Sequence, residues 1–148
     1  MKKIILCAGL AMTIATPAMA NGIAVCTGSI EDRNGLTDFS AYTLAQSDVP
    51  AIGREALKDE AERSFRASYS PQQRITCRAF AGTGHYVVVR AAQALNGRVI
   101  QLIGFGFGST REDALAASRA DLDGYPDYHM FIGRGGELEV VEEGSVDS

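Results

Sequence analysis

The residues best suited to acid–base chemistry in this sequence are its two histidines, His85 and His129. His85 follows Gly84, and Arg111 opens the alanine-rich run REDALAASRADL. Histidine is the side chain most often used for proton transfer near neutral pH. A small hydrolase or a small-ligand-binding domain that uses His85 and Arg111 is therefore one hypothesis. No serine lies in the G-x-S-x-G turn that activates the nucleophile of many hydrolases.

Residues 104–110 read GFGFGST, a row of alternating glycine and phenylalanine. A phosphate-binding loop holds its glycines in a turn whose amides converge, and in nucleotide hydrolases a lysine follows. Here the spacing is G-x-G-x-G and no lysine follows. The alternation predicts a strand with Phe105 and Phe107 on one face. The glycines on the other face would admit the close approach of the alanine-rich helix.

The stretch DLDGYPD at residues 121–127 is acidic but lacks the spacing of a calcium loop. An EF-hand loop has glycine at its sixth position and an oxygen ligand at its fifth. In this stretch Gly124 comes fourth and Tyr125 comes fifth. The end of a helix followed by a turn is the simpler interpretation. The histidines and cysteines also lack the spacing of zinc ligands, so we expect no metal site and no cofactor.

The first twenty residues have the features of a signal peptide. They contain Lys2 and Lys3, a short apolar stretch, and the small-x-small sequence Ala18-Met19-Ala20 that precedes a cleavage site. The apolar stretch is shorter than the ~20 residues that a membrane anchor needs. We expect cleavage after Ala20, a periplasmic or secreted mature protein, and no membrane span after cleavage.

Without the signal peptide, Cys26 and Cys77 are the two cysteines that remain. In a chain exported to an oxidising compartment, two cysteines predict one intramolecular disulfide. It would close a loop of about fifty residues, to which the chain-entropy model assigns ~4 kcal/mol. A free-thiol or metal-binding role for these cysteines is the alternative.

The charge of the chain argues against two classes of partner. Removal of Lys2 and Lys3 leaves 12 of the 14 basic residues against 18 acidic residues, a formal charge of −6. Nucleic acids and anionic membranes bind basic surfaces. We therefore expect no nucleic-acid partner, and another protein is the expected partner. The oligomeric state does not follow from the sequence.

Hydrophobic spacing predicts the elements that position these residues. The run from Arg54 to Ser68 places Leu57, Ala61 and Phe65 on one side of an amphipathic helix. A second helix should follow Ser109 as its cap and end near Leu122. Residues 21–37 are expected to be irregular, with turns at 31–38 and 96–97. The predicted strands are 39–45, 74–80, 85–91, 98–108, 128–132 and 138–141.

These elements predict an α+β fold with a mainly antiparallel sheet and two helices packed on one face. Each half contains a helix, a strand, a Gly-x-Gly turn and a further strand. Two strand-helix-strand-strand repeats are one interpretation of this likeness, and coincidence is the other. The expected boundaries are a signal peptide at 1–20, a single domain at 21–143 and a frayed acidic tail at 144–148.

The turns at 82–84 and 133–136 offer a surface on which a partner can bind. Loops on a rigid scaffold often bind partners, and tyrosine and arginine often anchor such contacts. The leading hypothesis is an exported, non-catalytic, protein-binding domain, such as an inhibitor or a toxin-neutralising (immunity-like) protein. The candidate binding residues are Thr83, His85, Tyr86, Arg111 and Arg134.

Overall fold

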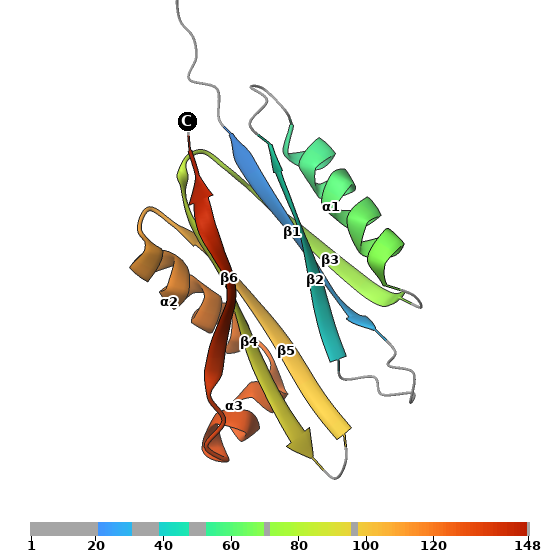
Figure 1. The fold of residues 1–148 in the computed structure, drawn as a ribbon, viewed down its shortest axis with the longest axis vertical. Helices are drawn as coiled ribbons and strands as arrows, with labels where there is room; N and C mark the ends of the chain where they lie inside the picture. Colours follow the sequence, from blue (N-terminus) through green and yellow to red (C-terminus); the bar gives the residue numbers. More distant parts are fainter. Residues whose placement is uncertain (1–20, 31–38, 48–52, 70–71, 96–97, 148) are drawn as a thin grey trace, which may run out of the picture.

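Six strands and three helices make up the part of the chain that the structure describes (Figure 1). This computed structural model describes residues 21–30, 39–47, 53–69, 72–95 and 98–147, so the predicted signal peptide and the predicted turns at 31–38 and 96–97 lie outside it. The mixed α+β class is confirmed. None of the three helices in the described ranges is long and apolar enough to cross a membrane. The elements in chain order are β1 (Gly22–Ile30), β2 (Phe39–Ser47), α1 (Arg54–Ser68), β3 (Gln72–Ala81), β4 (Gly84–Leu95), β5 (Arg98–Gly108), α2 (Arg111–Leu122), α3 (Pro126–Gly133) and β6 (Leu138–Val146).

The strands form two three-stranded antiparallel ladders. In the first ladder β1 lies between β3 and β2, and in the second ladder β4 lies between β5 and β6. Among the described residues, one parallel bridge, between Phe39 of β2 and Gln101 of β5, joins the two ladders into one strand order. Each half is therefore a hairpin, a helical segment and a third strand that pairs with the first strand of the hairpin.

This repeated order differs from the predicted strand-helix-strand-strand unit. The first half begins with β1, which the sequence analysis treated as irregular. Ile23, Ala24, Val25 and Cys26 are all at most 1% exposed, so β1 is buried on both faces and lacks the alternation that marks a half-exposed strand. Where an exposed face is absent, periodicity carries little information about a strand.

The second correction concerns residues 128–132, which were predicted as a strand and belong to α3. Pro126 occupies the first turn of this helix, where its missing N–H costs no hydrogen bond. Tyr128 and Phe131 are buried and lie three residues apart, on one side of the helix. The protein thus has a third helix in place of a predicted strand.

The helices cover different ladders. In α1, Leu57, Ala61 and Phe65 are buried against β1, β2 and β3, which confirms the predicted amphipathic helix. The second helix, α2, packs on β5 and β4. Figure 1 shows α1 and α2 on opposite sides of the strands. This arrangement corrects the prediction of two helices packed on one face.

The two ladders stack on each other through the faces that point away from the helices. Ile23 and Val25 of β1 form one buried cluster with Val88, Ile103 and Phe105 of the second ladder. The protein therefore has four layers, in the order α1, first ladder, second ladder, and α2 with α3 (Figure 1). Both faces of each ladder are covered at its centre, and the core lies in these three interfaces.

The glycines of β5 lie where α2 comes closest to the sheet. A Cβ added to Gly106 would lie 1.9 Å from the carbonyl oxygen of Ala114, and one added to Gly104 would lie 2.3 Å from that of Ser118. The interpretation of GFGFGST as a strand that admits close helix packing is confirmed. The cap of α2 is Thr110, whose side chain accepts a hydrogen bond from the N–H of Asp113, one residue beyond the predicted cap.

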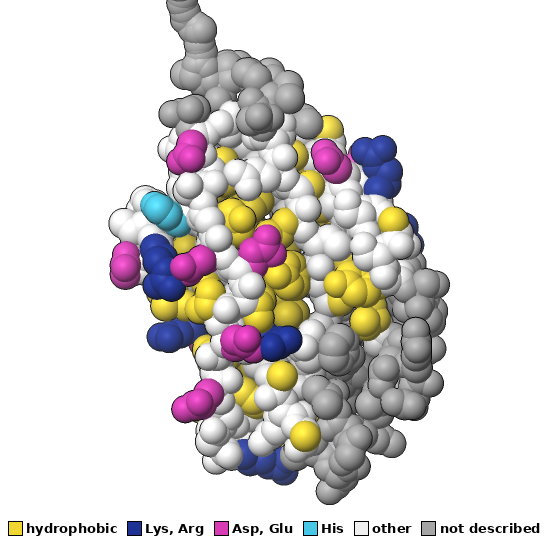
Figure 2. All heavy atoms as spheres, in the orientation of Figure 1, with side chains coloured by type: hydrophobic (Ala, Val, Ile, Leu, Met, Phe, Trp, Pro, Cys, Tyr) yellow, Lys and Arg dark blue, Asp and Glu magenta, His cyan; other side chains and the backbone are white. Residues whose placement is uncertain are grey.

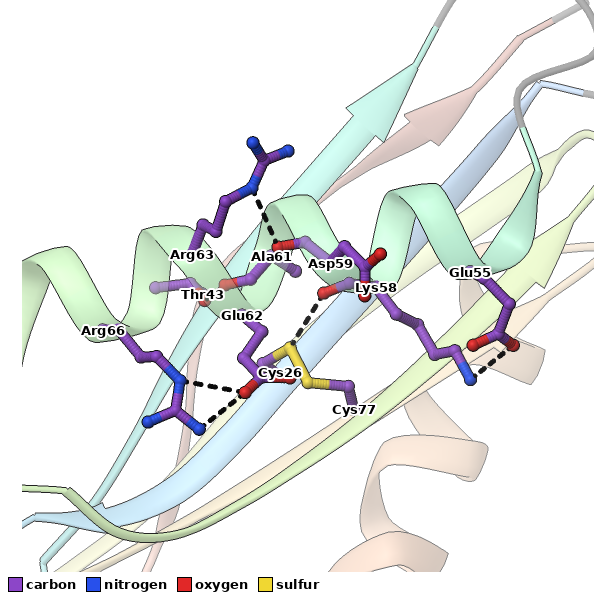
Figure 3. The surroundings of a disulfide bond; sticks show 10 residues. All are labelled: Cys26, Thr43, Glu55, Lys58, Asp59, Ala61, Glu62, Arg63, Arg66 and Cys77. Atoms are coloured by element: carbon purple, nitrogen blue, oxygen red, sulfur yellow. Dashed lines mark hydrogen bonds and ion pairs between the residues drawn. A yellow bond between two sulfur atoms is a disulfide. The ribbon is translucent and has the colours of Figure 1, made fainter.

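Cys26 and Cys77 form the predicted disulfide (Figure 3). They are directly paired on β1 and β3, and their Cα atoms are 4.1 Å apart. The bond lies under α1, where the Cys26 sulfur contacts the carbonyl oxygen of Lys58 at 3.7 Å. A bonded sulfur carries no hydrogen, so this is a packing contact. The disulfide ties the central strand of the first ladder to its edge strand.

The last strand extends past the predicted end of the domain at residue 143. It continues through Gly144 and Ser145 to Val146, which pairs with Gly84 and is 1% exposed. Residues 144–146, which the sequence analysis assigned to the frayed tail, therefore belong to the second ladder.

Candidate functional site

The structure brings four of the five candidate binding residues to one end of the second ladder. Thr83 is exposed in the turn between β3 and β4. His85 pairs with Gly108, at the end of β5, and Tyr86 is the next residue of β4. Arg111 follows shortly after β5, at the start of α2.

Arg134 does not join the other four. It follows α3 and precedes β6, whose first residue, Leu138, pairs with Ala91. Ala91 is six residues from His85 along β4, a separation of about 20 Å at ~3.3 Å per residue. His85, Arg111 and Arg134 therefore do not line one concavity.

His85 and Tyr86 point to opposite faces of β4, because successive side chains of a strand alternate. Tyr86 packs with the cluster between the two ladders, as does Val88, whereas Val87 belongs to the cluster under α2. His85 therefore lies on the α2 side of the ladder and Tyr86 on the inner side. The two residues do not share one surface.

Arg111 is engaged by a carboxylate from the edge strand. Its guanidinium group forms an ion pair with Glu143 of β6 at 2.7 Å, and a hydrogen bond from its Nε reaches the same carboxylate oxygen at 2.9 Å. The hydrogen bond with Glu143 and its negative charge raise the pKa of Arg111. This exposed pair joins the start of α2 to β6.

Aromatic and apolar side chains cluster on a different surface, between β2 and β6. Figure 2 shows hydrophobic side chains in the middle of this side of the molecule, in the region where Figure 1 draws β6 and β2. We call this surface the tyrosine face. Its half-buried members pack on the buried cluster between the ladders, and they are Tyr42, Leu44, Tyr86 and Val141, with the exposed Glu142 beside them.

Hydrogen bonds between β2 and β6 hold the tyrosine face together. The hydroxyl of Tyr42 donates to Oε2 of Glu142 at 2.7 Å. Further along the same strands, Nε2 of Gln46 donates to the carbonyl oxygen of Ser145 at 3.0 Å. Tyr86 lies against Gly144, where an added Cβ would meet the tyrosine ring and hydroxyl. Residues about 100 positions apart in the sequence thus form one surface.

The tyrosines of this face keep their protons at neutral pH. Burial, followed by the hydrogen bond to Glu142, raises the pKa of Tyr42 well above its ordinary value. Burial and the charge of Glu142 raise the pKa of Tyr86. Their hydroxyls are hydrogen-bond donors and acceptors there, not nucleophiles, so this surface suits binding better than covalent chemistry.

The sequence analysis identified Tyr86 but missed Tyr42 and Glu142. The alternation in FSAYTLA, residues 39–45, places Tyr42 and Leu44 on one face of β2 and was a usable signal. No comparable signal marks Glu142, because only the stacking of the ladders brings β6 beside β2.

The chain matches no protein-family model, and neither a curated protein nor a solved structure is significantly similar to it. Its function is therefore inferred from its own surfaces.

Proposed function

We propose that this protein is an exported, non-catalytic domain that binds another protein through the tyrosine face. The proposal includes cleavage after Ala20 and a periplasmic or secreted location. The Cys26–Cys77 disulfide supports that location, because disulfides persist in oxidising compartments and are rare in the cytosol.

The observation that carries the proposal is the pair of half-buried tyrosines over an apolar base. Tyrosine contributes a large contact area and one polar group at a low cost in conformational entropy, and it is enriched at the centres of protein interfaces. Tyr42 is already oriented by its hydrogen bond to Glu142, so little order has to be gained on binding.

The charge around this face indicates the kind of partner. Glu142 lies on the face, whereas the neighbouring exposed carboxylates of β6, Glu139 and Glu143, are paired with Arg90 and Arg111. The whole chain carries a formal charge of −4. Complementary charge steers association and selects partners, so the partner is a protein with a basic surface. An inhibitor or a toxin-neutralising protein fits this description.

The alternative function, a hydrolase or a small-ligand site that uses His85 and Arg111, is favoured by no observation of its own. Arg111 is paired with Glu143, and His85 and Tyr86 lie on opposite faces of β4. A substrate-dependent activity that is lost in His85→Ala would support this alternative.

The binding test compares recovery of a partner by wild-type protein and by variants in the tyrosine face. We expect a stoichiometric protein with a basic isoelectric point to copurify with the wild type. Tyr86→Ala and Glu142→Gln should each reduce its affinity about thirtyfold or more, since substitutions at hot spots cost ~2 kcal/mol or more. Glu60→Gln, in an exposed carboxylate of α1, is the matched control and should bind within about twofold.

Partner affinity that is equal in wild type, Tyr86→Ala and Glu142→Gln would contradict the tyrosine face as the binding surface. Each variant's melting temperature must first be shown to be near that of the wild type. Export is tested separately by cell fractionation and by determining the first residue of the mature protein. We expect Asn21, and a cytosolic chain that keeps residues 1–20 would contradict export.

A further inference from the structure

The inner face of the first ladder changes from apolar to polar along its length. Residues paired across the strands point to the same face. Val25 of the core pairs with Leu44 on one side, and the next inner position, Thr27, pairs with Tyr42 and Thr76. The following inner position, Ser29, pairs with Ser40 and Arg74. Polar side chains thus occupy positions that continue the core.

These polar side chains line a hollow of about 210 Å³. Tyr125, which lies between α2 and α3 in the second half of the chain, lines one side of the hollow. The hollow is smaller than the sites that hold drug-sized molecules, which begin at ~300 Å³. Its described polar lining consists of Thr27, Ser29, Ser40, Arg74, Thr76 and Tyr125, and none of its described lining residues is acidic.

Ser40 is the residue that points to a ligand. Its exposure is only 7%, and its hydroxyl has no hydrogen-bond partner among the described residues. Its carbonyl oxygen, in contrast, accepts a hydrogen bond from Nε2 of Gln101 at 2.9 Å. A buried hydroxyl without a partner costs free energy, which a ligand atom placed in the hollow would offset.

The lining also indicates the chemistry of that ligand. The guanidinium group of Arg74 is suited to a carboxylate, which it can bind with two parallel hydrogen bonds. The hydroxyls of serine, threonine and tyrosine donate and accept hydrogen bonds and match the hydroxyls of a polyol. Burial and the charge of Asp121 raise the pKa of Tyr125, so its hydroxyl keeps its proton at neutral pH.

We propose that this hollow binds a small polyhydroxylated carboxylate of about the size of a hexuronic acid, with the carboxylate on Arg74 and a ligand hydroxyl on Ser40. The hollow offers about seven times the ~30 Å³ that one water molecule occupies in the liquid, which is room for a single sugar ring. This site is separate from the tyrosine face and does not depend on its function.

The test is titration calorimetry or NMR titration with D-glucuronate, with D-glucose as the neutral analogue and sulfate as the bare oxyanion. We expect glucuronate to bind the full mature chain with a dissociation constant of about 1 mM, and glucose and sulfate to bind at least ~10-fold more weakly. Arg74→Gln should reduce the affinity for glucuronate at least ~10-fold. Arg63→Gln, in an exposed arginine of α1, is the control and should leave binding unchanged.

Ser40→Ala separates ligand binding from a structural role. Removing a hydroxyl that has no partner in the described part of the chain should leave the melting temperature of the free protein the same or higher, and should weaken glucuronate binding about threefold or more. The proposal is overturned by an absence of saturable glucuronate binding, or by unchanged binding in both Arg74→Gln and Ser40→Ala. Equally tight binding of glucose or of sulfate would also overturn it.

Discussion

Arg78 of β3 and Asp121 of α2 form an ion pair at 2.8 Å that joins the two halves of the chain. The same carboxylate oxygen of Asp121 accepts a hydrogen bond from the backbone N–H of Phe105 at 2.9 Å. The backbone N–H of Phe105 points to the edge of β5 that faces away from β4. The bridge to β2, at Gln101, does not extend to this residue. The carboxylate of Asp121 therefore accepts a hydrogen bond from the edge of β5 and connects that edge to the first ladder through Arg78.

We expect Asp121→Ala to destabilise the protein by about 1–3 kcal/mol, because it leaves the buried Phe105 N–H without its acceptor. Asp121→Asn keeps an oxygen that can accept from this N–H but removes the charge opposite Arg78, so its effect should be smaller. Urea unfolding measures both. Asp123→Ala, in an exposed residue of the same segment, is the control. An Asp121→Ala effect no larger than that of the control would contradict this role.

Gly106→Ala should be strongly destabilising. The added Cβ would lie 1.9 Å from the carbonyl oxygen of Ala114 and 2.3 Å from the amide nitrogen of Ser118. These are backbone atoms of α2, so the whole helix must move, and we expect a loss of about 3 kcal/mol or more. Gly133→Ala, where an added Cβ meets nothing within 4 Å, should change stability by less than about 1 kcal/mol. Thermal or urea unfolding of the two variants gives the comparison, and similar effects would disprove the close packing of β5 on α2.

Loss of the Cys26–Cys77 disulfide should cost about 4 kcal/mol of unfolding free energy. The bond spans a sequence separation of 51 residues, and most of its effect comes from restricting the unfolded chain. Urea unfolding of oxidised and reduced wild type measures this difference. The double variant Cys26→Ala/Cys77→Ala should behave as the reduced protein does. Unfolding midpoints that do not respond to reduction would contradict a stabilising disulfide.

The raised pKa of Tyr42 predicts a loss of stability in alkaline solution. The unfolded chain titrates this hydroxyl near pH 10, whereas the folded protein keeps the proton to higher pH. The stabilisation from the protonated hydroxyl is thus fully present below pH 10 and is lost as the pH rises through the folded pKa. Tyr42→Phe should remove part of the alkaline decline in unfolding free energy. Tyr128→Phe, in α3, is the control, and equal slopes in wild type and Tyr42→Phe would contradict the prediction.

Several features follow from short-range patterns in the sequence. The helix α1 is predictable because Leu57, Ala61 and Phe65 recur at helical spacing and form one apolar stripe. The packing of α2 on β5 is predictable because glycines alternate with phenylalanines just before an alanine-rich segment. The disulfide is predictable because only two cysteines follow the predicted signal peptide. Each of these signals is contained in a short segment of the chain or in the number of its cysteines.

Other features depend on how the ladders stack, which no short segment of sequence contains. β1 is buried on both faces and so shows no alternation, and α3 is formed by β-prone residues whose buried side becomes visible only against β4 and β5. Tyr42 meets Glu142, and Ser40, whose hydroxyl has no partner among the described residues, lies beside Arg74 and Tyr125, because the two halves of the chain face each other. The local chain specifies most helices and strands through periodicity. The candidate surfaces arise from contacts between distant residues, and packing free energy of the whole chain selects those contacts.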